Sequence, residues 1–130
     1  MENSAAASLG LSTIGQIGIT VKEVDRAIAF YRDVLGMKLL FQVPGMGFFA
    51  CDSVRLMVSA AENPQDQYSS VIYFKVARIE EAYTTLLERG AAFDGLPHLV
   101  ARMPDHDLWM AFFRDPDRNL LALMCEVARP

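Results

Sequence analysis

Along this chain, strand-like alternation of hydrophobic and polar residues is followed by helical spacing of hydrophobic residues, and this sequence of patterns occurs twice. Residues 13–21 alternate, as in a strand with one buried face, and apolar residues then recur at helical spacing over 24–35. The same change occurs from residues 70–76 to residues 79–89. The pattern predicts a strand followed by an amphipathic helix in each half of the chain.

The two stretches match each other at a constant offset of 55 residues. Gln16 falls on Val71, and Val24 falls on Ile79. Each helical stretch is followed by a glycine that suits a left-handed helix end, Gly36 or Gly90. One copy alone would leave a sheet face uncovered, so we expect the copies to face each other, with any site between them.

Short apolar runs separated by Pro, Gly, Asp and Ser predict the remaining strands. The first copy continues with strands at 38–43, 47–51 and 55–59, and residues 60–68 form a polar linker. The second copy continues with candidate strands at 91–93, 99–103, 108–114 and 119–126. Strand, helix and three strands, repeated, predict an α+β fold in which two helices cover the outside of a curved, antiparallel-rich sheet.

Composition limits the classes of partner. The chain has 130 residues, 52% of them hydrophobic, with a formal net charge of −4, which favours one domain and argues against a nucleic-acid partner. No apolar run approaches the roughly 20 residues that a membrane helix needs. Residues 1–12 are expected to form a flexible tail without a signal peptide, followed by a single domain over 13–130. Cys51 and Cys125 are expected to be free thiols, which favours the cytoplasm.

Two motifs carry a resemblance to a known family. Residues 29–36 read Ala-Phe-Tyr-Arg-Asp-Val-Leu-Gly, and residues 113–121 read Phe-Arg-Asp-Pro-Asp-Arg-Asn-Leu-Leu. With the repeat, these stretches resemble the vicinal oxygen chelate superfamily, which includes glyoxalase I, extradiol dioxygenases, methylmalonyl-CoA epimerase and bleomycin resistance proteins. The resemblance implies two βαβββ modules, at 13–60 and 68–127, that form an open eight-stranded cup with helices outside, commonly in a dimer.

The resemblance also implies where a divalent ion would be held. The family's ligand positions fall on Gln16 and Met57 in the first module and on Val71 and Ala122 in the second. Only the amide of Gln16 is a suitable ligand for such an ion, which needs three or four converging donors. We therefore expect no metal site and no cofactor, with a divalent metal kept as an alternative.

An apolar cup suits the binding of a small molecule. Gln16 either contacts that ligand through its amide or is a buried residue bonded to a neighbouring strand. Trp109 faces the cup if the odd-numbered residues of 108–113 do; otherwise it belongs to the core or to a dimer interface. The expected ligand-binding residues are Gln16, Met57, Val71, Tyr73, Trp109 and Ala122.

His106 and Tyr73 are the candidate catalytic residues. His106 lies between Asp105 and Asp107, whose carboxylates would favour its charged form and suit acid–base chemistry. The alternatives are that His106, like His98, lies in a surface loop, and that Tyr73 only packs within the sheet. Arg118 replaces a glycine of the family's turn, so either the turn type differs or Arg118 is strained there.

These observations predict a small-molecule-binding protein of the glyoxalase/bleomycin-resistance type, a cytoplasmic homodimer without a tightly bound metal, nucleic-acid partner or membrane contact. The alternative is a lyase or epimerase, resembling glyoxalase I or methylmalonyl-CoA epimerase, that uses an atypical metal site or metal-free proton transfer. A third possibility is a structural or regulatory dimer whose cup is filled by its own side chains. The ligand's identity, catalysis and the exchange of modules between subunits are left open by the sequence.

Overall fold

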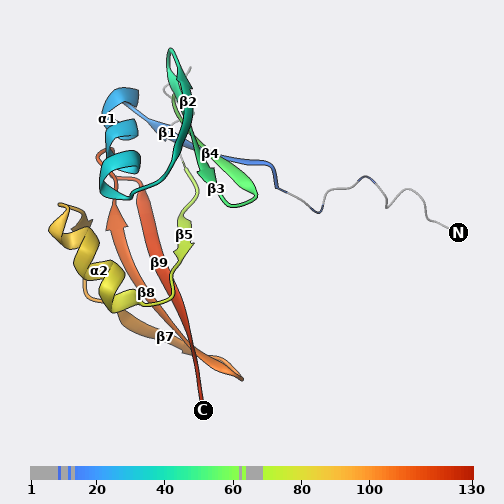
Figure 1. Cartoon of the computed structure of the whole chain (residues 1–130), viewed down its shortest axis with the longest axis vertical. Helices are drawn as coiled ribbons and strands as arrows, with labels where there is room; N and C mark the ends of the chain where they lie inside the picture. Colours follow the sequence, from blue (N-terminus) through green and yellow to red (C-terminus); the bar gives the residue numbers. More distant parts are fainter. Residues whose placement is uncertain (1–8, 10–11, 13, 62, 64–68) are drawn as a thin grey trace, which may run out of the picture.

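Figure 1 shows the computed structural model, which describes residues 9, 12, 14–61, 63 and 69–130. Most of the expected tail and linker therefore lies outside the described residues. Two groups of strands lie one above the other, and both helices lie on the same side of them (Figure 1). No helix among the described residues is long and apolar enough to cross a membrane.

The first module contains four strands and one helical stretch. Its strand order is β1-β4-β3-β2; β1 and β4 run parallel, and the other neighbours run antiparallel. The alternation of buried and exposed side chains along β1 and β4 follows the pattern in the sequence. Its elements are β1 (Gln16–Val21), α1 (Val24–Ala29), η2 (Phe30–Val34), β2 (Leu39–Val43), β3 (Met46–Cys51) and β4 (Val54–Ala60).

The second module repeats this arrangement with one additional short strand. Its order is β5-β9-β8, and both β6 and β7 pair with β8. Strand β8 begins at His106, two residues before its expected start, so His106 belongs to a strand rather than to a connection. Its elements are β5 (Ile72–Lys75), α2 (Ile79–Glu88), β6 (Ala92–Phe93), β7 (His98–Arg102), β8 (His106–Arg114) and β9 (Leu120–Ala128).

The predicted duplication is visible in the strand register. Gly18 of β1 lies opposite Met57, and Tyr73 of β5, 55 residues after Gly18, lies opposite Ala122. The α+β fold of two βαβββ modules with helices outside is therefore confirmed. Among the described residues, the strand pairings form two sheets, one in each module.

The first helix differs from the expected regular helix over 24–35. Its second half, η2, is a π-helical turn in which the Leu35 amide donates to the Phe30 carbonyl at 3.1 Å, five residues back. This turn contains one residue more than the corresponding turn of α2. The offset of 55 at the helix starts consequently becomes 54 at Gly36 and Gly90, both of which have positive φ.

The core lies between each sheet and its helix. Phe49 and Val58 are fully buried in the first module, and Phe113 and Leu121 are fully buried in the second. Gly47 of β3 lets α1 lie close to the sheet, because a Cβ atom there would lie 2.6 Å from Ile28 Cγ1. The sheet faces turned away from the helices remain available for a site.

Candidate functional site

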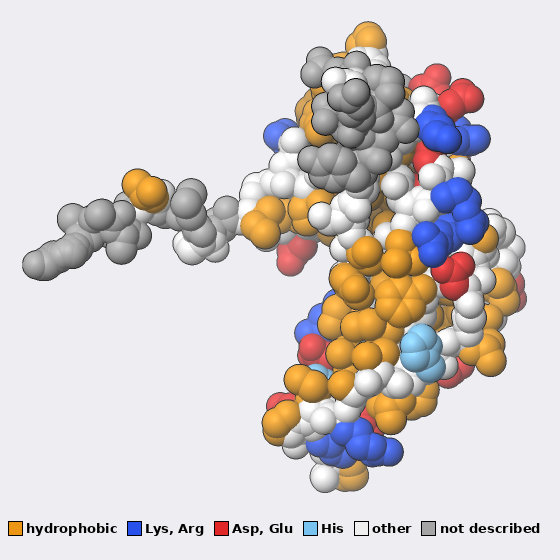
Figure 2. Space-filling model, turned by 180° about the vertical axis from the view of Figure 1, so that it is seen from behind, with side chains coloured by type: hydrophobic (Ala, Val, Ile, Leu, Met, Phe, Trp, Pro, Cys, Tyr) orange, Lys and Arg blue, Asp and Glu red, His pale blue; other side chains and the backbone are white. Residues whose placement is uncertain are grey.

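We call the sheet surface turned away from the helices the cup face. In the first module it carries Gln16, Arg55 and Met57, together with Phe48 opposite Met57 in the neighbouring strand. Seen from behind, hydrophobic side chains form a band over the second module, the lower part of the molecule (Figure 2). Large apolar side chains are exposed on the cup face of both modules: Phe41 is 45% exposed in the first, and Tyr73 is 47% exposed in the second. Exposed apolar surface of this kind is typical of a binding site.

Two phenylalanines and an arginine dominate the first half of the cup face. The rings of Phe41 and Phe48 are stacked, with centroids 4.5 Å apart and planes 23° apart. The guanidinium carbon of Arg55 lies 5.4 Å from the centroid of Phe48, within the range of a cation–π contact. Beside them, the Gln16 amide nitrogen donates to the Met57 sulfur at 3.6 Å.

Aromatic rings also dominate the second half of the cup face. The rings of Tyr73 and Phe112 are nearly perpendicular, with centroids 6.3 Å apart, and the centroid of the His98 ring lies 6.2 Å from that of Phe112. The His98 Nδ1 atom is 3.0 Å from the Leu96 carbonyl oxygen. Ala122, opposite both Tyr73 and Phe112, is fully buried beneath them.

The structure thus places Gln16, Met57, Tyr73 and Ala122 on the cup face. Val71 precedes β5 and, by the alternation of the strand, shares the face of Tyr73. The expectation that Trp109 lines the cup is wrong, because Trp109 lies opposite Cys125 and packs against the helix-facing core. Alternation correctly separated the two faces of β8 but did not say which face the helix covers.

The two catalytic candidates lie far apart on this face. Tyr73 is opposite Ala122 and His106 is opposite Ala128, a separation of six residues or about 20 Å along β9. His98 lies nearer to Tyr73, because it is opposite Met110, which is in turn opposite Met124. The pattern around His98 predicts a surface loop, whereas the structure places His98 at the start of β7.

His106 belongs instead to a row of charged groups at the outer end of the second module. Its Nδ1 atom is 2.7 Å from a carboxylate oxygen of Asp105, and this hydrogen bond holds the pKa of Asp105 below its usual value. Its Nε2 atom is 3.9 Å from Glu126, whose other oxygen pairs with Lys75 at 3.1 Å. This row is polar and partly exposed, unlike the aromatic surface around Tyr73.

The residues present do not fit the divalent ion that the resemblance implies. The strand register puts Met57 and Ala122 at equivalent positions in the two modules, and neither side chain offers the nitrogen or oxygen donor that such an ion needs. Val71 offers no donor either, so Gln16 stands alone. No group of three or more His, Cys, Asp and Glu side chains in the described part of the chain could hold a metal ion.

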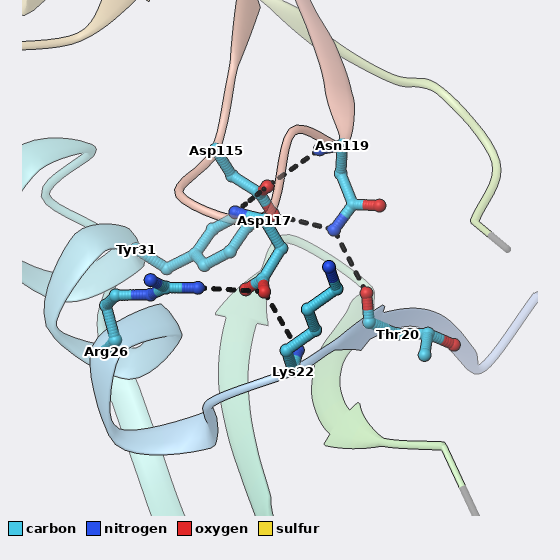
Figure 3. Close-up of polar contacts among 7 residues, drawn as sticks. All are labelled: Thr20, Lys22, Arg26, Tyr31, Asp115, Asp117 and Asn119. Atoms are coloured by element: carbon cyan, nitrogen blue, oxygen red, sulfur yellow. Dashed lines mark hydrogen bonds and ion pairs between the residues drawn. The ribbon is translucent and has the colours of Figure 1, made fainter. Parts of the chain in front are cut away.

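The motif at 113–121 joins the two modules rather than forming the cup. The buried Tyr31 hydroxyl donates to the Asp115 carboxylate at 2.9 Å, and Asp115 also accepts the backbone amides of Asp117 and Asn119 (Figure 3). Burial raises the pKa of Tyr31, and the negative charge of Asp115 raises it further, so the phenol stays protonated.

The same turn holds the start of the first helix and the end of β1. The Asn119 side-chain amide donates to the Thr20 carbonyl at 3.0 Å, and Asp117 accepts from the Lys22 amide at 3.0 Å and from Arg26 at 2.9 Å (Figure 3). Arg118 within this turn has a φ of 69°, so the strained alternative is the one observed.

Comparison with known proteins places the chain in a family. The model of the glyoxalase/bleomycin resistance protein/dioxygenase superfamily matches residues 13–123, which include both modules and the turn that joins them. The chain belongs to this superfamily. The resemblance found in the two sequence motifs is therefore confirmed.

The chain is also similar to one curated protein and to two solved structures. The uncharacterized protein YraH of Bacillus subtilis (strain 168) is 24% identical over 126 residues, covering 83% of this chain and 94% of YraH. A lactoylglutathione lyase from Agrobacterium tumefaciens is 22% identical, with a TM-score of 0.70 over 89% of this chain and 95% of the lyase. TnmS3, an antibiotic-binding protein from Streptomyces sp. CB03234, is 23% identical, with a TM-score of 0.73 over 91% of this chain and 98% of TnmS3. At these identities the two solved structures share the fold of this superfamily member.

Proposed function

We propose that this superfamily member binds a small organic molecule on its cup face and holds no metal ion tightly. The proposal rests on the chemistry of the four positions at which the superfamily holds a divalent ion. Here they are Gln16, Met57, Val71 and Ala122, and only Gln16 has an oxygen that could bind the ion. Aromatic rings lie on the same face of each sheet. Such a surface favours burial of an apolar ligand over Lewis-acid chemistry.

The superfamily contains both binding proteins and enzymes, so the fold alone does not choose between them. TnmS3 binds an antibiotic, and the Agrobacterium protein is a lactoylglutathione lyase. The donor set supports the binding function for this chain. Cys51 and Cys125 are free thiols, which supports a reducing compartment such as the cytoplasm.

We further propose that the ligand site is completed by a second copy of the chain. The ring pairs Phe41–Phe48 and Tyr73–Phe112 and the Gln16–Met57 hydrogen bond each lie within one module. Phe41, Met46 and Tyr73 are 40–47% exposed. A homodimer in which the first module of one subunit faces the second module of the other would cover these side chains and enclose a ligand.

A thermal-shift screen of small aromatic compounds tests the binding function. We expect compounds that stabilise the wild type to stabilise Leu87→Glu equally, but to lose their effect on Tyr73→Glu, because the two side chains are equally exposed and only Tyr73 lies on the cup face. If no compound stabilises the wild type, the cup is filled by its own side chains and the proposal is wrong.

Elemental analysis of protein purified without chelator tests the metal state. We expect no stoichiometric ion, and no binding on titration with zinc, nickel or cobalt, because Gln16 alone cannot hold one. One bound ion per chain that is lost on Gln16→Ala would contradict the proposal and favour the lyase or epimerase alternative.

A further inference from the structure

We infer that the ligand is a planar aromatic anion whose charged group binds to Arg55. This inference rests on the proposed binding function and adds the chemical class of the ligand. It follows from three features of the first half of the cup face: an arginine with no carboxylate partner among the described residues, an aromatic ring in contact with this arginine, and a second ring stacked on the first.

The first feature is the ion-pairing state of Arg55. Arg55 lies on the cup face between Gln16 of β1 and Ala50 of β3, and no carboxylate of the described residues lies within ion-pair distance of it. Six arginines on other surfaces have carboxylate partners: Arg26, Arg32, Arg78, Arg102, Arg114 and Arg129. Arg89 and Arg118 have none among the described residues, but they lie at the end of α2 and in the 115–119 turn rather than on the cup face. The charge of Arg55 therefore remains available to a ligand.

The second feature is the contact of Arg55 with Phe48. The Arg55 guanidinium carbon lies over the Phe48 ring, 5.4 Å from its centroid. The N–H donors of a guanidinium group point outward from its edges, where they can bind a carboxylate or a sulfonate through two hydrogen bonds. A contact that orders the side chain before binding reduces the conformational entropy lost when the anion binds. Burial by the ligand would also remove water and strengthen the ion pair.

The third feature is the ring of Phe41, which stacks on the same Phe48 ring that Arg55 contacts. Phe41 stacks on Phe48 and is 45% exposed, so a ligand ring can cover it while the ligand's anionic group reaches Arg55. The chain as a whole carries a net charge of −4, which disfavours anions elsewhere on its surface. Preference for an anion must therefore come from a local cation such as Arg55.

A fluorescence titration with three probes tests this inference on the full chain at low salt. The probes are 9-anthracenecarboxylate, the neutral 9-anthracenemethanol, and adamantane-1-carboxylate, a non-aromatic anion that competes for the site. We expect the anthracene carboxylate to bind at least tenfold more tightly than either of the other two compounds. Arg55→Gln should weaken its binding by about tenfold to a hundredfold and leave the alcohol within about twofold.

Arg32→Gln is the matched control, because it removes the same charge from an exposed ion pair on the helical side. It should leave all three affinities unchanged, and equal melting temperatures of the two variants would show that Arg55→Gln is folded. Equal binding of carboxylate and alcohol, or an unchanged preference in Arg55→Gln, would overturn the inference while leaving the binding function intact. If the adamantane anion bound as tightly as the anthracene carboxylate, the inference that the ligand is aromatic would be wrong. Binding of no probe would count against both proposals.

Discussion

Arg118 has a strained backbone conformation in the turn that joins the modules. Its φ of 69° is a conformation that side chains with a Cβ adopt with strain. We expect Arg118→Gly to raise the free energy of unfolding by about 1 kcal/mol, because glycine adopts this φ freely. Chemical denaturation measures the change, and Arg118→Ala, which keeps the strain, should remain close to the wild type.

Gly47 is required because a larger residue would not fit between the sheet and α1. A Cβ atom at this position would meet Ile28 Cγ1 at 2.6 Å, and Ile28 is itself buried. Gly47→Ala should therefore lower the free energy of unfolding by about 1–3 kcal/mol as α1 is pushed from the sheet. Gly95→Ala, where no atom lies within 4 Å, should change it little; similar losses in both variants would refute the steric explanation.

At the scale of elements, the contact between η2 and the β8–β9 turn depends on one buried hydroxyl. Tyr31→Phe leaves Asp115 without one of its donors and should cost about 1–3 kcal/mol of unfolding free energy. Tyr83→Phe is the control, since the Tyr83 ring packs on Phe93 and its hydroxyl has no hydrogen bond among the described residues. Equal effects of the two substitutions would show that the hydrogen bond contributes nothing.

The raised pKa of Tyr31 predicts a dependence on alkaline pH. Above about pH 10 the unfolded chain releases the Tyr31 proton while the folded chain retains it, so the unfolded state is favoured as pH rises. The wild type should therefore lose stability more steeply than Tyr31→Phe between about pH 10 and 11. Urea denaturation across this range measures both slopes, and parallel slopes would contradict the assignment.

The sequence predicted the elements well because alternation and helical spacing are local properties. The offset that aligns Val24 with Ile79 also matches the first residues of α1 and α2 in the structure. Contacts between residues that are far apart in the sequence could not be predicted in this way. Tyr31 and Asp115 are 84 residues apart, and nothing in either motif shows that they form a hydrogen bond.

The cup face was harder to predict than the fold. Trp109 was assigned to the wrong side of β8, because both faces of this strand are apolar and only packing against α2 decides between them. The contact of Arg55 with Phe48 could not be predicted, since it depends on the register of β3 and β4. The extra residue in η2 shortens the offset to 54 at the glycines, a signal that was present in the sequence.

At the scale of the whole molecule, a mixing experiment tests whether two copies complete the cup. Phe41→Glu and Tyr73→Glu each introduce a charge on one half of the cup face at an exposed position. Each variant alone should fail to bind 9-anthracenecarboxylate, but refolding an equimolar mixture should restore about a quarter of the sites, because half of the random dimers hold one intact cup. No recovery in a confirmed dimer would show that each chain builds its own cup.

The turn at 115–119 has a consequence for how the chain unfolds. Two repeated modules could in principle melt separately, even though their buried side chains belong to one hydrophobic cluster. Yet the residues that close the last hairpin are also those that hold α1 and the end of β1. Loss of either module thus exposes the buried carboxylates of the joint, and scanning calorimetry should record a single cooperative transition. A duplicated gene segment would in this way have become one inseparable folding unit.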